Sequence, residues 1–457
     1  MNRVKNMTEG SPARLMVFFA APLILANFGQ QLYMIADAMI VGQGVGVEAL
    51  ASVGATDWSY WLALWVVQAL TQGFAIPVSH YFGTGDRKRI RQTVAMAVWL
   101  CLIIGLLMTA LCLFLARPLL SLLQTPDDIF DGACAYLLTM YGGILIVMAY
   151  NMASSILRAL GDGKTPLIAI TIAAITNVLL DLLFVFGFHW GILGAAAATL
   201  IAQLLAFFYC FRVLRQMEWI RITRDDWRPR RDILARHCRL GFPLALQHIL
   251  IAVGGMILQS AINRHGFVFI AGFTATNKIY GLLESSAISL GYAVTTFMAQ
   301  NYGGGFYSRI RSGLKSAFFI ACALSVCVSV FMILAGRPIL RLFIDASNAS
   351  ADQTLDIAYH YLFIMSCLLI FLYLLYVFRN TLQGLGNTIT SLISGIMEFF
   401  ARVSAAYYFT GLFGDEAIFF AEPFAWFAAM AILITVCLKT VSRLPEDPPK
   451  AGLADPR

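Results

Sequence analysis

Two stretches of this sequence repeat the same glycine and arginine pattern. Residues 81–91 read YFGTGDRKRIR, and residues 301–311, which lie 220 positions further on, read NYGGGFYSRIR. The residues that recur at the same spacing are Gly83, Gly85, Arg89, Ile90 and Arg91. Self-similarity at a fixed distance is typical of proteins built from repeated units. The sequence therefore predicts a duplicated chain whose two halves share one fold.

Shorter matches extend the duplication on both sides of this pair. The matched segments are 21–23 with 242–244 (APL and FPL), 51–56 with 271–276 (ASVGAT and AGFTAT), and 157–161 with 382–386 (LRALG and LQGLG). They occur in the same order in both halves. The repeat thus spans most of the chain.

The composition places the protein in a membrane. Hydrophobic residues make up 60% of the 457 positions and charged residues 12%, whereas soluble domains carry about 25% charged residues. The apolar runs are continuous, not alternating, and reach the ~20 residues that a spanning helix needs, which favours helices over a barrel. The expected helices are 15–42, 51–80, 92–116, 132–157, 166–188, 192–211, 240–263, 267–299, 315–336, 357–382, 387–411 and 418–438. We expect an all-α polytopic membrane protein with twelve transmembrane helices.

The positions of the basic residues predict the orientation. An N-terminus inside the cell places 26 of the 32 Lys and Arg on the cytoplasmic side, including Arg379 and the nine arginines between Arg212 and Arg239. Cytoplasmic loops carry such an excess. We therefore expect both termini in the cytoplasm and attribute the net charge of +7 to topology, with no nucleic acid as partner.

The charged stretch in the middle of the chain divides it into two blocks of six helices. We expect an N-terminal lobe at 1–211, a cytoplasmic linker at 212–239, a C-terminal lobe at 240–440 and a cytoplasmic tail at 441–457. Because both blocks begin inside the cell, the repeat is parallel, and the two lobes are pseudo-symmetric. This architecture is typical of transporters that alternate access to a central cavity.

Several motifs in order resemble one family of transporters. They are Tyr33-x-x-x-Asp37, Val41-Gly42, Asn177-Val-Leu-Leu-Asp181 and residues 299–303 (AQNYG), together with the repeated stretches above. Over nearly the whole chain they resemble the multidrug and toxic compound extrusion (MATE) family. The resemblance implies a cation-coupled antiporter with two six-helix lobes. It would export amphipathic, often cationic small organic compounds in exchange for protons or sodium, with no cofactor besides the coupling ion.

The resemblance also assigns site residues. Asp37 matches the first-helix aspartate with which one branch of the family binds the coupling cation, and Asn177, Asp181 and Thr199 match its partners. Pro22 matches a proline associated with helix bending. Another branch has a glutamate in the seventh helix, where this chain has Ile251, so the cation site of that branch is not expected here.

The chemistry of these acids agrees with ion coupling. Asp37 and Asp181 have no basic residue within one helical turn, and each has a polar neighbour four positions earlier, Tyr33 and Asn177. Two carboxylates that face one pocket favour the protonated form of at least one of them. The same oxygens, with the Thr199 hydroxyl, would also suit sodium, and residue types do not choose between the two ions. The alternative is that both acids are hydrogen-bonded elsewhere and serve packing only.

The repeat confines this acid pair to the first lobe. The matched segments 21–23 and 242–244 are 221 positions apart, which makes Leu258 the counterpart of Asp37 in the second half. The segments 157–161 and 382–386 are 225 positions apart, which makes Ala406 the counterpart of Asp181. We expect cation handling in the N-terminal lobe, with the C-terminal lobe serving as a wall of the substrate cavity.

Charged residues within the other apolar runs cost free energy to place in a membrane, so we expect each of them to have a partner or a function. Glu398 and Arg402 stand at i,i+4, which predicts an intrahelical ion pair. Lys278 and Glu284 are six apart, on different faces, and should not pair. Glu284 would instead attract a cationic substrate, and Lys278 would extend toward the membrane interface or pair with an acid.

Polar and aromatic side chains of the first lobe are candidates for the substrate cavity. They are Gln30, Gln68, Gln72, Tyr136 and Asn151, to which Glu284 is added from the second lobe. Such residues bind flat cations by stacking and hydrogen bonding, or else join neighbouring helices. Pro22 is either a hinge or a static kink in the first helix.

No catalytic pattern is present in the sequence. The six His residues are isolated, the nine Cys form no CxxC pair, and the glycines at 303–305 are not followed by the Lys-Ser/Thr of a phosphate loop. We expect a monomeric, multi-pass protein of the inner (plasma) membrane that is not an enzyme. Two alternatives remain: a lipid-linked oligosaccharide flippase of the same superfamily, which would need fixed positive charge, and a non-transporting receptor.

Overall fold

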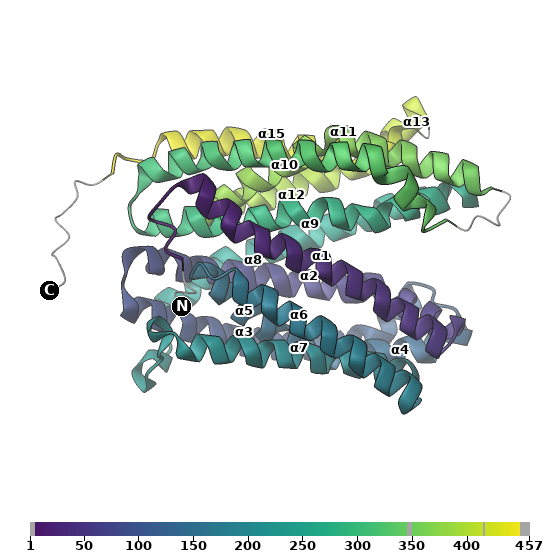
Figure 1. Ribbon diagram of the computed structural model, residues 1–457, viewed down its shortest axis with the longest axis horizontal. Coiled ribbons are helices and arrows are strands. Elements are labelled where there is room, and N and C mark those ends of the chain that lie inside the picture. Colours follow the sequence, from purple (N-terminus) through teal and green to yellow (C-terminus); the bar gives the residue numbers. More distant parts are fainter. Residues whose placement is uncertain (1–4, 345–349, 415, 448–457) are drawn as a thin grey trace. The chain divides into compact units, whose positions relative to one another are not determined.

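The computed structural model describes residues 5–344, 350–414 and 416–447, without the side chains of residues 32–36, 38, 43, 47, 50 and 413. All regular secondary structure in these residues is helical (Figure 1). The long helices are α1 (Pro12–Gly44), α2 (Val47–Thr84), α3 (Arg87–Leu122), α4 (Asp127–Gly142), α5 (Ile144–Ala159), α6 (Lys164–Asp181), α7 (Gly191–Gln216), α8 (Arg231–Ile262), α9 (Phe267–Gly303), α10 (Tyr307–Arg341), α11 (Ala351–Gly384), α12 (Thr388–Val403) and α15 (Ala421–Ser442). The short elements are η1 (Leu182–Gly187), η2 (Glu218–Ile220), η3 (Arg224–Trp227), η4 (Ser404–Phe409), α13 (Thr410–Phe413) and α14 (Glu416–Phe419).

The helices confirm the all-helical membrane class. Within the described residues, ten helices are long and apolar enough to cross a bilayer, and α4 with α5, bent by 44° at Gly143, forms an eleventh candidate span. The remaining expected helix, 267–299, is present as α9 with 37 residues. It is not among the candidate spans, because polar residues such as Asn277, Lys278 and Glu284 lower its hydropathy.

The chain forms two compact units. The first unit comprises Ala21–Val78 and Asp86–Ile249 with Lys5, and the second comprises Asn6–Ala20, Ser79–Gly85 and the described residues from Leu250 onward. In the first unit α7 packs against α5 and α6, and α3 packs against α4 and α5. In the second unit α11 packs against α9, α10 and α15, and α12 packs against α15 (Figure 1).

The duplicated glycine stretch forms the same turn in both halves of the chain. Gly85 and Gly305 each have φ of +74°, a left-handed conformation that glycine adopts without a steric cost. Each glycine lies between the end of one long helix and the start of the next. In the first half the side chain of Asp86 then caps α3 by accepting a hydrogen bond from the Arg89 amide at 2.9 Å.

The last turn of α2 belongs to the second unit and contacts α9 through glycines. A Cβ atom added to Gly83 would overlap the carbonyl oxygen of Gln300, and one added to Gly303 would overlap the carbonyl oxygen of His80. These are contacts with main-chain atoms, which cannot rotate away. The two repeat-related glycines therefore allow two helix backbones to approach closely.

We expect Gly83→Ala to destabilise the protein by about 1 to 3 kcal/mol or more, because the added methyl group has no space. The matched control is Gly54→Ala in the same helix, where an added Cβ meets nothing within 4 Å and alanine favours the helix. Thermal unfolding of the purified variants in detergent measures both. Equal unfolding midpoints for Gly83→Ala and Gly54→Ala would contradict the close helix contact.

The segment between α7 and α8 is fastened to α3 by a buried acid. Asp226 in η3 has a side chain 3% exposed and accepts hydrogen bonds from the Thr223 amide (2.9 Å), the Thr223 hydroxyl (2.8 Å) and Arg91 Nε (3.0 Å). Burial by itself would raise the pKa of Asp226. The hydrogen bonds from Thr223 and the charge of Arg91 outweigh burial and leave the pKa of this carboxyl below its ordinary value.

Asp226 therefore gives a stability that depends on pH. Because the pKa is lower in the folded protein, the carboxylate stabilises the fold above the unfolded pKa of about 3.9, and this contribution is lost as the pH falls further. We expect Asp226→Asn to cost about 1 to 3 kcal/mol at pH 7 and progressively less below about pH 4. Unfolding midpoints measured across this range provide the test, with Asp225→Asn, whose side chain is 83% exposed, as control. A difference between parent and Asp226→Asn that is constant with pH would contradict this assignment.

Candidate functional site

The structure brings together the two acids that the sequence singles out in the first lobe. Asp37 lies on α1, and Asp181 is the last residue of α6. Their carboxyl groups lie close enough for each to influence the ionisation of the other. Asp181 is fully buried and Asp37 is half-buried. Residues that are distant in the chain thus form one acidic site within the first unit.

This acid pair lacks hydrogen-bond donors. No described side chain or backbone group donates to Asp37 Oδ1 or to either carboxyl oxygen of Asp181, and none of the ion pairs in the described residues involves these two acids. Two neighbouring carboxylates that are largely shielded from water repel each other and are not both ionised unless a cation lies beside them. The pair therefore requires a proton between the two groups or another cation beside them.

Asn177 and Thr199 supply further oxygen atoms beside Asp181. Asn177 lies one turn before Asp181 on α6, and its Nδ2 donates to the Thr199 hydroxyl on α7 at 3.2 Å. This bond orients the Asn177 amide and leaves its Oδ1 buried without a donor in the described structure. The donor set, made only of carboxyl, amide and hydroxyl oxygens, suits a proton or a hard cation such as sodium. In the described part of the chain, no group of three or more His, Cys, Asp or Glu residues could hold a metal ion.

The backbone changes its winding directly after Asp181. α6 continues into the six-residue π-helical segment η1, Leu182–Gly187. π-helical segments are rare and are found frequently at functional sites. The α12 helix of the second unit continues in the same way into the π-helical segment η4, Ser404–Phe409.

The other predicted residues of the first lobe lie in several places. Tyr136 on α4 is buried, in the same unit as the two acids and near enough to feel their charge. Sequence spacing gave no signal for this, because α4 is remote from both acids in the chain. The Tyr33 side chain lies outside the described residues.

The amide residues proposed for the cavity differ in their exposure. Gln30 on α1 and Gln72 on α2 are half-buried, whereas Gln68 on α2 is exposed. Asn151 on α5 donates to the Val147 carbonyl of its own helix at 2.9 Å. Their role in the cavity remains a prediction.

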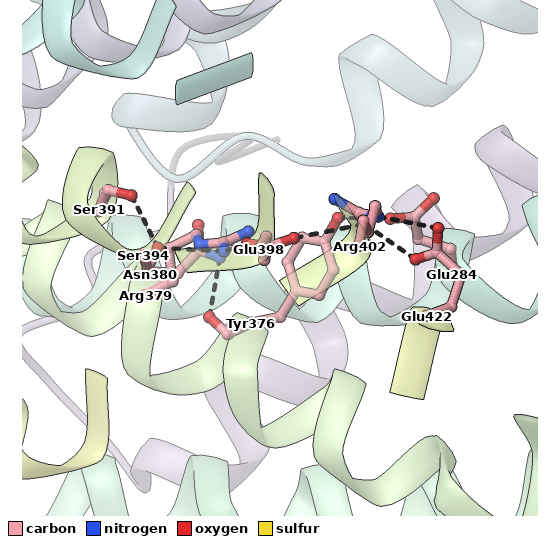
Figure 2. A network of polar contacts seen from close by, with 9 residues as sticks. All are labelled: Glu284, Tyr376, Arg379, Asn380, Ser391, Ser394, Glu398, Arg402 and Glu422. Carbon is pink, nitrogen blue, oxygen red and sulfur yellow. Dashed lines mark hydrogen bonds and ion pairs between the residues drawn. The ribbon is translucent and has the colours of Figure 1, made fainter. Parts of the chain in front are cut away.

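The second unit contains a buried network of charged residues that sequence reasoning found only in part (Figure 2). The residues drawn in Figure 2 are Glu284, Tyr376, Arg379, Asn380, Ser391, Ser394, Glu398, Arg402 and Glu422. Arg402 on α12 donates to both carboxyl oxygens of Glu422 on α15, at 2.9 and 2.8 Å. Glu398 lies 3.6 Å from Arg402 and also pairs with Arg379 of α11.

Arg379, counted in the sequence among the basic residues of the cytoplasmic side, lies within α11, as the expected helix 357–382 implies, and its side chain is only 7% exposed. Its guanidinium is compensated by Glu398 and by the Ser394 hydroxyl at 3.1 Å, both on α12. A partner on another helix leaves no trace in local spacing, so the sequence could not show it.

The predicted pair of Glu398 and Arg402 is confirmed, although each has a closer partner on another helix. Glu284 accepts a hydrogen bond from the Tyr376 hydroxyl at 2.8 Å and does not pair with Lys278, as expected. Three carboxyl groups thus face two guanidinium groups in the network, and Glu284 is the acid that pairs with neither.

The geometry defines a class of protein, a duplicated helical membrane protein with ionisable sites buried among its helices. The MatE family model matches residues 22–183 and 243–408, one segment in each half of the chain. The chain belongs to the multidrug and toxic compound extrusion (MATE) family.

Individual relatives agree with this assignment. The Bacillus subtilis protein named "Probable multidrug resistance protein YpnP" is 30% identical over 364 residues, which cover 79% of this chain and 81% of that protein. A Thermotoga maritima protein named "Probable multidrug resistance protein NorM" is 23% identical over 87% of each chain. The solved structure "Crystal structure of MATE in complex with MaL6" matches with a TM-score of 0.88 and 22% identity, covering 96% of this chain and 98% of that one; this likeness shows the fold.

Family membership confirms the broad predictions. The protein is a multi-pass membrane transporter of the MATE family, whose members are ion-coupled antiporters and not enzymes. The resemblance found in the sequence and the expected two-lobe MATE fold are likewise confirmed.

Proposed function

We propose that the protein exports amphipathic, cationic small organic compounds in exchange for a coupling cation that binds at Asp37 and Asp181. One observation supports the proposal: two neighbouring acids of the first unit, Asp181 fully buried and Asp37 half-buried, have buried carboxyl oxygens that accept from no donor among the described residues. Asn177 and Thr199 complete the oxygen set around a proton or sodium. Tyr136 is a further candidate, and Tyr33, one helical turn before Asp37 in the sequence, stays a prediction because its side chain lies outside the described residues.

The acid pair explains why cation and substrate movements are linked. Uncompensated charge within a membrane protein is costly, so the state with the loaded pair and the state with the empty pair favour different packing of α1 against α6. A cation that binds one conformation better shifts the population toward it. Binding of cation from outside and its release inside then drive alternating access, with substrate moving in the opposite direction.

Pro22 is the proposed hinge of α1. It lies inside the helix, and the division between the two compact units falls one residue earlier, after Ala20. Proline removes one helix hydrogen bond and weakens the helix at that point. We expect Pro22→Ala to fold normally but to transport several-fold more slowly. Equal initial rates for Pro22→Ala and the parent protein in a vesicle assay would contradict the hinge and show that Pro22 only makes a static kink.

The surroundings of Glu284 favour the proposal that the substrate is a cation. It carries the carboxyl group in excess over the two arginines of the network, and the aromatic residues Tyr376 and Tyr280 lie near it. Tyr280 stacks on Trp426 with ring centroids 6.1 Å apart. A carboxylate beside aromatic rings is suited to an organic cation. Gln30, Gln68, Gln72, Tyr136 and Asn151 remain candidates for further contacts in the cavity.

The same network does not favour the flippase alternative. A pyrophosphate headgroup needs positive charge that is free to bind it, and Arg379 and Arg402 are both held by glutamates. We propose further that the protein is a monomer of the inner membrane with both termini in the cytoplasm. The lobes at 1–211 and 240–440 would then move about the linker at 212–239.

Transport of a fluorescent organic cation into inverted membrane vesicles tests the proposed function. A proton gradient and a sodium gradient are imposed separately, with vesicles that lack the transporter as baseline. We expect accumulation under one of the two gradients, which identifies the coupling ion. Binding of the dye without accumulation under either gradient would refute antiport and revive the receptor alternative.

A further inference from the structure

The second unit contains a structural counterpart of the helix that carries Asn177. Asp162 caps α6 by accepting from the Thr165 amide at 2.9 Å, and Asn387 caps α12 by accepting from the Thr390 amide at 3.2 Å. In both caps the threonine hydroxyl donates to the same side chain.

The residue before each cap has the same unusual backbone. Gly161 has φ of +87° and Gly386 has φ of +84°. These residues are separated by 225 positions, the same offset that relates the matched segments 157–161 and 382–386. The sequence repeat is thus reproduced in the side-chain hydrogen bonds and in the backbone. Twelve positions beyond Thr165 and Thr390, Asn177 corresponds to Arg402.

Asn177 and Arg402 also bond to corresponding helices. Asn177 donates to Thr199 on α7, the last long helix of the first half, and Arg402 donates to Glu422 on α15, the last long helix of the second half. Each of their own helices then continues into a six-residue π-helical segment. The two sites are therefore built by the same elements, in the same order.

Both sites contain carboxyl groups, but only the second contains a basic side chain that pairs with them. In the first unit the acids Asp37 and Asp181 surround a position where the described residues place no base. In the second unit the matching positions are Leu258 and Ala406, each 4% exposed and apolar. One turn before Ala406 on the same helix path, the side chain of Arg402, 6% exposed, is held by the carboxylates of Glu422 and Glu398.

We propose that Arg402 is a tethered cation that permanently occupies, in the second unit, the place that the exchangeable coupling cation takes in the first. The inference rests on the proposed function of Asp37 and Asp181. A cation attached to the chain cannot dissociate, so this site stays filled in every conformation and exchanges nothing. Arg402 is thus a positioning residue: it confines cation exchange to the first unit and fixes α12 to α15.

The proposal is tested by removing the Arg402 guanidinium and measuring whether a free cation binds in the site between Glu422 and Glu398. Arg402→Ala is made in the Asp37→Asn chain, so that the first unit does not contribute a cation response. Thermal unfolding of the purified protein is followed in millimolar guanidinium chloride and in choline chloride at equal ionic strength. We expect the midpoint of the Arg402→Ala chain to rise by about 1 to 3 °C for each tenfold increase in guanidinium, because a ligand of the folded state stabilises it. The Asp37→Asn chain itself should not respond.

Three variants keep the test decisive. Arg402→Lys retains a tethered charge and should show no guanidinium response. Arg402→Gln empties the place with less loss of volume and should respond like Arg402→Ala. If neither neutral variant folds, recovery of folded Arg402→Gln/Glu422→Gln supports the proposal, because that change restores the charge balance and not the packing.

An equal response of Arg402→Ala and its Asp37→Asn parent to guanidinium would overturn the proposal, as would failure of the charge-balanced double variant together with the single ones. The readout is stability, so it does not depend on transport. Failure of the proposed function would appear separately, as gradient-driven export that persists in Asp37→Asn.

Discussion

Asp181→Asn is expected to abolish gradient-driven export while the protein still folds. Asparagine has the shape of aspartate but cannot take up a proton, and it does not supply the charge that would hold sodium. The initial rate of dye accumulation in inverted vesicles should fall to that of vesicles without the transporter. Asp37→Asn should have the same effect, because the two carboxyl groups act as one coupled site.

Stability separates this loss from misfolding. Neither acid has a donor or a base among the described residues, so removal of one charge should leave the unfolding midpoint unchanged or raise it. Asp131→Asn is the matched control, since Asp131 is an acid of the same unit with a side chain 94% exposed, and it should transport at the parent rate. Export at the parent rate by either Asp37→Asn or Asp181→Asn would refute the site.

The largest effect on stability is expected from breaking the buried ion pair of Arg379 and Glu398. Both side chains are at most 7% exposed, and removal of one partner from a buried pair costs about 3 to 5 kcal/mol because the other charge is left uncompensated. Arg379→Met should therefore lower the unfolding midpoint strongly. Arg379→Met/Glu398→Met should recover most of the loss, because the double change removes both charges.

An exposed ion pair of the same unit provides the comparison. Arg337 and Asp356 are paired, but their side chains are 49% and 65% exposed, and such pairs contribute about 0 to 1 kcal/mol. Arg337→Met should thus change stability little. A double variant no more stable than Arg379→Met alone would show that packing, and not charge, accounts for the loss.

The fold was predictable because its signals are local and repeated. The glycines at 85 and 305 recur since each must adopt a left-handed turn between two helices, and continuous apolar runs are long enough to be recognised as spans. Helix α9 was found in the same way despite its polar residues. The bend between α4 and α5 was not predicted, since no proline marks it.

The candidate site was predictable only where the residues themselves are unusual. Asp37 and Asp181 stand out because acids are rare in apolar runs, and the family resemblance linked them to Asn177 and Thr199. The pairs of Arg379 with Glu398 and of Arg402 with Glu422 were not predicted, because the two members of each pair lie on different helices. Rules of spacing report neighbours within one helix, whereas the networks that compensate buried charge form between helices.

The most direct test of cation coupling at the acid pair is its reversal in proteoliposomes. A gradient of an organic cation is imposed without any ion gradient, and movement of protons or sodium is followed with an internal pH dye and with radioactive sodium. The account predicts that substrate flow drives one of these ions in the opposite direction, and that Asp37→Asn and Asp181→Asn abolish this flux. Substrate flow through the parent protein without movement of either ion would contradict it.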